Sequence, residues 1–181
     1  MAEVATRSAT LIAIARDAIA RDARPQAGKT WDDPWLRETG ACFVTLRLDD
    51  DLRGCVGSVD AHRALGDDVA HNAFAAAYRD SRFDPVSPVE RERLAVEVSV
   101  LSPRSPFAVA SEQDALGAMR PGIDGIYLQY RHLHATFLPQ VWENIPDPLD
   151  FLCELRRKAG LPTRFWHDEV KLSRYTVEKY K

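Results

Sequence analysis

The stretch CFVTLRLDDDLRGCVGSV, residues 42–59, decides the fold class. Apolar and polar residues alternate from Cys42 to Leu48, as they do in a strand with one buried face. Asp49 to Asp51 make a polar turn, and the chain returns over Leu52 to Val59. The segment therefore predicts a β-hairpin, and hairpins join antiparallel strands.

Further strands and helices are predicted along the chain without strict βαβ alternation. Alternating residues predict strands at Leu94–Leu101, Ile126–Tyr130, His134–Leu138 and Val170–Tyr180. Apolar residues at helical spacing predict helices at Ala9–Ala23 and Leu65–Tyr78. Ser111 as an N-cap, with Asp114 three residues later, predicts a short helix at Asp114–Met119. A fourth helix is expected to be capped by Asp147, to begin at Pro148 and to stop at Gly160, with Leu149, Leu152, Leu155 and Ala159 facing inward. Residues Ala23–Asp33 are expected to form a loop. The pattern predicts an α+β fold, with a mixed or antiparallel sheet and flanking helices.

Composition narrows the class of protein. The chain has 181 residues, which fits one domain or at most two small lobes. A net charge of −3, with basic residues spread among acidic ones, argues against nucleic acid as a partner. No apolar run is long enough to span a membrane, and the N-terminal residues lack the layout of a signal peptide. Three cysteines without CxxC spacing suit a reducing compartment, so we expect a cytoplasmic protein with free thiols.

The segment LRGCVGS, residues 52–58, is the first candidate site. In a regular strand Arg53 and Cys55 would share a face, and the guanidinium would favour the thiolate. Gly54 and Gly57 flank the thiol, and glycine in a strand often marks a close approach by a ligand or by another backbone. One interpretation is a reactive thiol beside an anion-binding arginine. The other is a buried structural cysteine, with the glycines serving the geometry of the hairpin.

The segment YRDSRF, residues 78–83, is the second candidate. Arg79 and Arg82 are fork-shaped donors that can hold a carboxylate or phosphate, and Asp80 can pair with either. The alternative is that these charges only complete the end of a helix. The segment TFLPQVWE, residues 136–143, holds two further candidates. Gln140 could form hydrogen bonds with a polar ligand, whereas we expect Trp142 to lie in the core.

Metal and cofactor motifs are missing from the sequence. His132 and His134 form an HxH pair, but no further ligands lie at a recognised spacing. No GxGxxG, GxxxxGK[ST], GxSxG or HExxH motif occurs. We therefore predict neither a metal site nor a bound cofactor.

Six segments in this order carry a resemblance to a known family: LRGCVGS (52–58), AAAYRDSRF (75–83), VEVSVLSP (96–103), RPGIDGI (120–126), TFLPQVWE (136–143) and RKAGLP (157–162). Together they resemble the AMME syndrome candidate-region protein family, whose bacterial and archaeal members are called AmmeMemoRadiSam system protein A. The resemblance covers about residues 40–180 of a single domain, 1–181, in which residues 1–39 supply an N-terminal helix and loop. The family usually has a Gly- and Arg/Lys-rich stretch where this chain has His132 to His134, which argues further against a metal site there.

The resemblance implies two unequal lobes, with both termini in the larger one and a cleft between them. It places Arg53, Gly54, Cys55 and Gly57 at the centre of a site, with neighbours Arg79, Asp80, Arg82, Thr136 and Gln140. The family's own reaction is not assigned by the resemblance, but its genes often accompany those of Memo-like and radical-SAM proteins. Two functions stay open: an enzyme or enzyme component acting on a small anionic substrate, with Cys55 and Arg53 as catalytic groups, or a non-catalytic adaptor for a Memo-like or radical-SAM partner.

Overall fold

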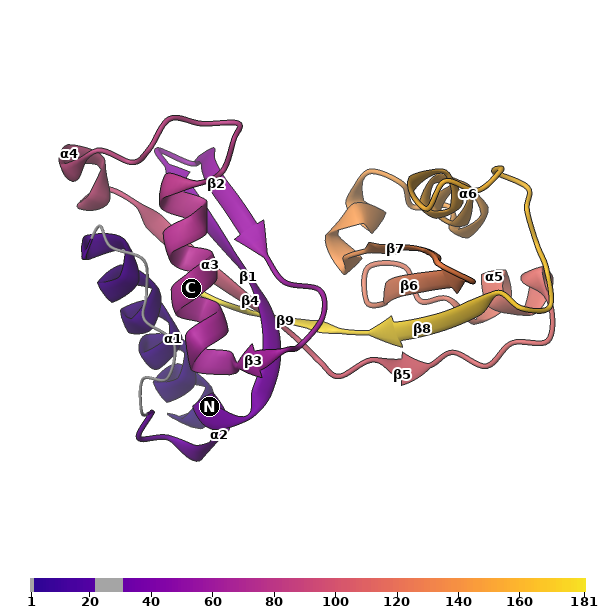
Figure 1. Cartoon of the computed structure of the whole chain (residues 1–181), viewed down its shortest axis with the longest axis horizontal. Helices are drawn as coiled ribbons and strands as arrows, with labels where there is room; N and C mark the ends of the chain where they lie inside the picture. The colour runs from indigo at the N-terminus through magenta and orange to yellow at the C-terminus, as the bar shows by residue number, and fades with distance from the viewer. Residues whose placement is uncertain (1, 22–30) are drawn as a thin grey trace. The chain divides into compact units, whose positions relative to one another are not determined.

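The computed structural model of the chain describes residues 2–21 and 31–181. The chain divides into two compact units, Met1–Leu101 with Glu178–Lys181, and Ser102–Val177. Each unit combines helices with its own antiparallel sheet (Figure 1), so the predicted α+β class is confirmed.

The first unit is built on the predicted hairpin. Strand β1 (Thr39–Leu48) pairs with β2 (Asp51–Gly57) on one side and with β4 (Ala95–Leu101) on the other. The sheet order is β2-β1-β4-β9, with β9 at Val177–Tyr180 and the short β3 (Arg63–Ala64) pairing with β1. Strand β2 is therefore an edge strand, and its outer side needs other hydrogen-bond partners.

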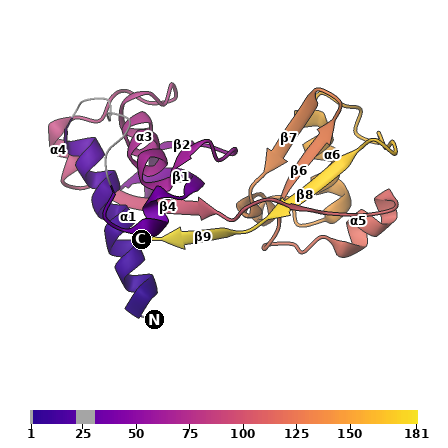
Figure 2. The same cartoon turned by 60° about the horizontal axis from the view of Figure 1, so that its bottom comes forward.

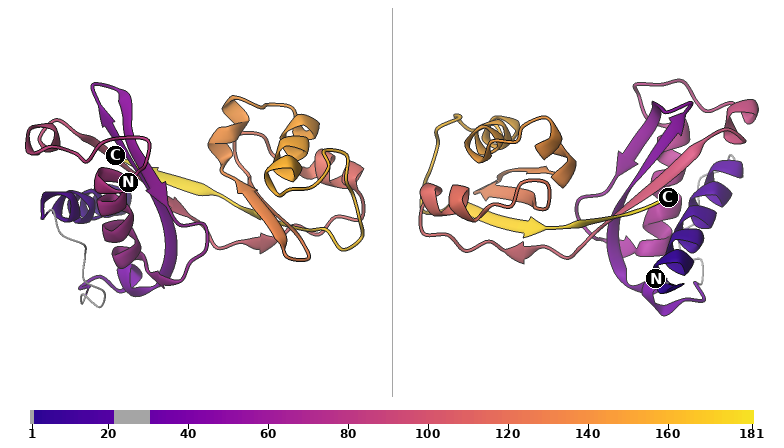
Figure 3. Two further views of the ribbon diagram at one scale, coloured as in Figure 1. Left: turned by 45° about the horizontal axis from the view of Figure 1, so that its top comes forward. Right: turned by 180° about the vertical axis from the view of Figure 1, so that it is seen from behind.

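Two helices cover one face of this sheet. Helices α1 (Ala2–Ala20) and α3 (Leu65–Tyr78) lie side by side on that face (Figure 3). Their apolar stripes meet the inward-facing residues of the strands in one core. Its fully buried members include Leu11, Val69 and Ala73 from the helices and Val44, Leu46 and Val98 from the sheet. The short helices α2 (Pro34–Arg37) and α4 (Pro88–Arg91) flank this core, and no helix in the described part of the unit packs on the opposite face.

The second unit holds a four-stranded sheet in the order β5-β8-β6-β7. The strands are β5 (Ser105–Pro106), β6 (Gly125–Tyr130), β7 (Leu133–Phe137) and β8 (Lys171–Tyr175). Figure 2 shows α6 (Pro148–Lys158) behind this sheet. Helix α5 (Glu112–Ala118) and the 3-10 helix η1 (Pro139–Glu143) complete the core. Trp142 is buried there as predicted, with its ring stacked 3.7 Å from that of Phe151.

The predicted helices are confirmed with shifted ends. Helix α3 has the expected bounds, and Asp147 caps α6 by accepting hydrogen bonds from two backbone N–H groups. Leu149 was expected to face inward but is exposed, because Phe151 and the residues one turn further on fill the core instead. Helix α1 begins earlier than expected. Its predicted end at Ala23 and most of the predicted loop, Ala23–Asp33, lie outside the described residues.

The prediction of one long final strand, Val170–Tyr180, is wrong. Strand β8 ends at Tyr175 and β9 begins at Val177, and the two strands belong to different sheets. At the break, the Thr176 N–H donates to Ser102 Oγ (2.9 Å) and the Ser102 N–H donates to the Thr176 carbonyl (2.9 Å). Both segments have the period of a strand, so the alternation does not reveal the change of sheet.

Candidate functional site

A β-bulge interrupts β2 at Arg53. Gly54 lies opposite Leu46 and Leu52 lies opposite Arg47, so Arg53 is left without a partner residue in β1. A bulge adds one residue to one strand and redirects its side chain. The expectation that Arg53 and Cys55 share a face assumed a regular strand, and the structure does not have one at this point.

The Arg53 guanidinium forms an ion pair with Glu90 of α4. Its Nε lies 2.8 Å from Glu90 Oε1, and its Nη2 lies 3.3 Å from Oε2. The same carboxylate accepts from the Ser87 N–H in the capping box of α4 (2.8 Å). These contacts, chiefly the hydrogen bonds from Arg53, lower the pKa of Glu90 to about 2. Arg53 Nη1 is buried and makes no hydrogen bond to any residue that the structure describes.

The backbone of Cys55 is held by the segment that follows α3. Its N–H donates to Asp80 Oδ2 (2.9 Å), and its carbonyl accepts from Arg82 Nη2 (3.2 Å). Asp80 and Arg82 in turn form a two-point ion pair, with Nε–Oδ1 at 2.9 Å and Nη2–Oδ2 at 2.6 Å. The hydrogen bond from Arg82 holds the pKa of Asp80 well below its usual range. This ion pair satisfies the edge of β2 in the way that a neighbouring strand would.

The Cys55 side chain lies on the sheet face opposite α1 and α3, and it is half-buried. Thr45, its direct partner in β1, places Oγ1 3.5 Å from Cys55 Sγ and donates to it. Glu97 of β4 lies opposite Thr45 and completes a row of Cys55, Thr45 and Glu97 across three strands. The Cys55 thiol therefore lies in a polar row on the sheet face that α1 and α3 do not cover.

Both glycines beside Cys55 are in close contact with other parts of the protein. A Cβ on Gly54 would clash with the backbone carbonyl of Ala76 in α3, and a Cβ on Gly57 would clash with the ring of Phe43. Glycine at these two positions therefore lets β2 pack against α3 on one face and against Phe43 on the other.

The remaining predicted residues lie elsewhere. Arg79 is exposed, with its guanidinium 5.4 Å from the centre of the Phe74 ring. Thr136 and Gln140 belong to the second unit, where Thr136 Oγ1 donates to the Ile126 carbonyl (2.8 Å) and Gln140 is exposed on η1. The structure thus gathers Arg53, Gly54, Cys55, Gly57, Asp80 and Arg82 around β2 in the first unit.

Three neighbours of this group were missed by the sequence analysis: Thr45, Phe83 and Glu90. The guanidiniums of Arg53 and Arg82 lie 5.9 and 5.4 Å from the centre of the Phe83 ring. Ser87 and Glu90 have the S-x-x-E spacing of a capping box, which could have predicted α4 but not its ion pair.

The HxH histidines do not form a pair within one strand. His132 lies in the turn before β7, whereas His134 lies in β7 and stacks on Tyr127. The described residues contain no group of three or more His, Cys, Asp or Glu side chains placed to hold a metal ion. Among the same residues, no helix is both long and apolar enough to cross a membrane.

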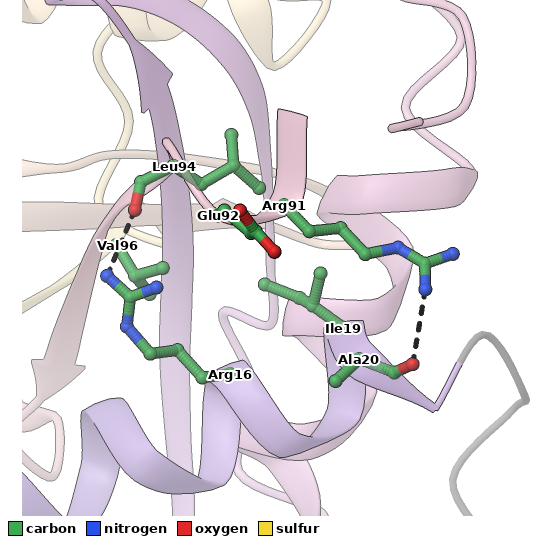
Figure 4. Close-up of a pocket in the computed structure, with 7 residues that line it drawn as sticks. All are labelled: Arg16, Ile19, Ala20, Arg91, Glu92, Leu94 and Val96. Atoms are coloured by element: carbon green, nitrogen blue, oxygen red, sulfur yellow. Dashed lines mark hydrogen bonds between the residues drawn. The ribbon is translucent and has the colours of Figure 1, made fainter. Parts of the chain in front are cut away.

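A separate pocket of about 220 Å³ lies between the end of α1 and the start of β4 (Figure 4). Ile19, Leu94 and Val96 form its apolar wall. Arg16 donates to the Leu94 carbonyl (3.0 Å), and Arg91 donates to the Ala20 carbonyl (3.2 Å). The guanidiniums of Arg16 and Arg91 therefore join α1 to Leu94, just before β4, and to α4. No predicted site residue lines the pocket.

Comparisons with known proteins agree with the fold. A protein from Methanothermobacter thermautotrophicus is 35% identical over 178 residues, which cover 93% of this chain and 91% of the relative. One from Thermotoga maritima is 37% identical over 152 residues, covering 83% and 82%. The crystal structure of uncharacterized protein PH0010 from Pyrococcus horikoshii matches with a TM-score of 0.78 at 30% identity, covering 94% of this chain and 88% of that one.

The family model for AMMECR1 matches residues 12–180, nearly the whole chain. That match includes every residue of the group around β2 and extends through both units. The resemblance found in the sequence motifs is therefore confirmed, and the chain belongs to the AMMECR1 family.

Proposed function

We propose that the chain is an enzyme or enzyme component that acts on a small anionic substrate, with Cys55 as nucleophile or acid/base. The observation that carries this proposal is the placement of the Cys55 thiol. It is half-buried on the sheet face opposite α1 and α3 and accepts a hydrogen bond from Thr45 Oγ1. A structural thiol would be expected on the helix-covered face, where Cys42 is fully buried and burial raises the pKa of its thiol.

Two guanidiniums supply the positive charge for an anion. Arg82 reaches the Cys55 carbonyl, and its side chain is 53% exposed, so its remaining donors are open to a ligand. Arg53 is bound to Glu90 but keeps the buried Nη1 without a hydrogen bond among the described residues. A carboxylate or phosphate oxygen held by the exposed part of Arg82 would also feel the charge of Arg53, because the guanidiniums of both residues lie within 6 Å of the centre of the Phe83 ring. We assign anion binding to these two arginines, with Asp80 as the residue that positions Arg82.

The test is alkylation of Cys55 by iodoacetamide, followed by mass spectrometry as a function of pH. Cys55→Ser identifies the signal, and the half-buried Cys153 serves as the internal reference. We expect Cys55 to react faster than Cys153 at neutral pH, and inorganic phosphate to slow Cys55 alone. Arg82→Gln should abolish this protection, whereas the matched change Arg79→Gln should preserve it. Equal rates for Cys55 and Cys153 would contradict the nucleophile role.

A second candidate function is a non-catalytic adaptor for a Memo-like or radical-SAM partner. The observation in its favour is that the contacts around Cys55 also serve the fold. Asp80 and Arg82 close the edge of β2, and Gly54 and Gly57 are packed against other parts of the chain. In this interpretation Cys55 is a small half-buried residue without a chemical role.

Cys55→Ala separates the two functions. An adaptor would keep its fold, its co-purification with the partner and the partner's activity after this change. An enzyme component would keep its fold and its partner but lose the activity that depends on the thiol. Circular dichroism of the variant shows in both cases whether folding is unchanged.

A further inference from the structure

The second unit has a sheet face that no function proposed above uses. On the side opposite α6, the register sets His134, Gln129 and Lys171 in one row across β7, β6 and β8. The next row holds Thr136, Tyr127 and Ser173. Figure 2 shows these three strands in front of α6. We call the six residues of these two rows, together with Arg104, the β6–β7–β8 face.

An aromatic stack stands on this face. The imidazole of His134 is stacked on the Tyr127 ring, with ring centres 5.9 Å apart and planes 23° from parallel. The guanidinium of Arg104, just before β5, lies 4.1 Å from the centre of the same ring. His134 is exposed although its ring is held by Tyr127. A planar group held in place and open to solvent can stack on another planar group at little cost in side-chain entropy.

The charges on this face are all positive. Arg104 and Lys171 are exposed, and no acidic residue occupies this face of β6, β7 or β8. Lys171 makes no ion pair with any residue in the described part of the chain. The helical elements η1 and α6 carry both signs, with Glu143, Asp150 and Glu154 alongside Arg156, Arg157 and Lys158. The net charge of −3 describes the whole chain, so it does not exclude a local basic face.

We propose that the β6–β7–β8 face binds single-stranded nucleic acid, with one base stacked on His134 and backbone phosphates held by Lys171 and Arg104. Aromatic platforms beside cationic side chains are how sheet surfaces bind unpaired nucleotides. Gln129 lies between His134 and Lys171 in the row and presents an exposed amide, which can donate to and accept from the edge of a base.

A single strand suits this face better than a duplex or a protein. Two cations are too few for the broad phosphate contact on which duplex affinity depends. A duplex also hides the faces of its bases, so His134 would have nothing to stack on. An acidic peptide would use the two cations but not the exposed imidazole and amide between them.

Fluorescence anisotropy on the full-length chain tests the proposal. The probes are a fluorescein-labelled oligo(U) of about 12 nucleotides, a duplex of the same length, and ATP as a competitor. We expect saturable binding of the single strand below about 100 µM, weaker binding of the duplex, and no displacement by ATP at the same concentration. Binding should weaken between about 50 and 200 mM salt.

Variants assign the binding to this face. His134→Ala should weaken binding by about fivefold or more, since one stacked base contributes at least that much. Lys171→Glu should also weaken it and lower the slope of log K against log salt by about 0.7. The matched controls are His132→Ala in the turn and Lys179→Glu in β9, both exposed and off this face. They should bind as the unchanged chain does.

Four results would overturn the proposal. They are no saturable binding of the single strand, equal or tighter binding of the duplex, displacement by ATP, and equal losses in the His134 and His132 variants. Because Cys55 takes no part in these measurements, their outcome is independent of whether the Cys55 thiol is reactive.

Discussion

Replacing Gly54 by alanine should be among the most destabilising single-methyl changes in the first unit. A Cβ built on Gly54 would lie 3.0 Å from the carbonyl carbon of Ala76 and closer still to its oxygen. Real Cβ atoms essentially never approach that closely, and the obstacle is the backbone of α3 rather than a flexible side chain. Strand β2 and helix α3 would therefore have to move apart, by about 1 Å or more to reach ordinary contact.

The cost has two parts. Overpacking a core costs about 1 to 3 kcal/mol. The same displacement loosens the hydrogen bonds that hold Cys55 to Asp80 and Arg82, and such bonds to charged groups contribute about 1.5 to 3 kcal/mol each. We therefore expect a loss of about 3 kcal/mol or more in the free energy of unfolding, measured by urea denaturation.

Gly117→Ala is the matched control. Gly117 lies within α5, and a Cβ there would meet nothing within 4 Å. Alanine in a helix is more favourable than glycine by about 1 kcal/mol, so this variant should be as stable as the unchanged chain or slightly more stable. A Gly54→Ala chain within about 0.5 kcal/mol of the unchanged one, the range of ordinary surface changes, would refute the packing described for β2 and α3.

Three other changes test further contacts, two beside β2 and one in the core of the second unit. Asp80→Ala should cost about 1 to 3 kcal/mol and speed hydrogen exchange of the Cys55 amide, because it removes the acceptor of that N–H; slow exchange there would contradict the described edge. Glu90→Gln should destabilise the chain most above about pH 4.5, where the carboxylate is charged in both states, and the difference should shrink as the pH falls through about 2. Urea denaturation across that pH range checks the sign of the change in stability, since a carboxylate with a lowered folded-state pKa stabilises the fold only at pH values above that pKa. Trp142→Phe should cost about 1 to 2 kcal/mol in thermal unfolding, because the indole N–H donates to a buried carbonyl (2.7 Å); an unchanged midpoint would rule out that contribution.

The elements that could be predicted are those that local sequence specifies. The hairpin of β1 and β2 follows from alternation and from the polar turn at Asp49 to Asp51. Helix α6 follows from Asp147, Pro148 and Gly160, each of which acts within one helical turn. Neither prediction required knowledge of which elements pack together.

The features that could not be predicted depend on distant parts of the chain. The break between β8 and β9 is set by pairing with two different sheets and by the hydrogen bonds between Thr176 and Ser102. The bulge at Arg53 follows from the pairing of β2 with β1, and it invalidates the rule that residues two apart share a face. Leu149 was misplaced because helical spacing does not show which edge of an apolar stripe the core reaches.

The candidate site shows the same division. The sequence motifs predicted Arg53, Cys55, Asp80 and Arg82 as site residues, and all four lie at β2 in the structure. It did not reveal that Arg82, rather than Arg53, is the guanidinium bonded to Cys55, because Glu90 draws Arg53 into an ion pair. That partner lies far away in sequence and becomes a neighbour only when α4 docks beside the edge strand.

The central claim is that Cys55 is the chemically available thiol of this chain. The most direct measurement is the order in which the three native thiols react with a limiting amount of iodoacetamide at neutral pH, read by peptide mass spectrometry. The proposed function predicts that Cys55 reacts first and Cys153 later, and burial predicts that Cys42 reacts last. Labelling of Cys153 before Cys55, or of Cys55 only together with Cys42 on unfolding, would contradict the claim.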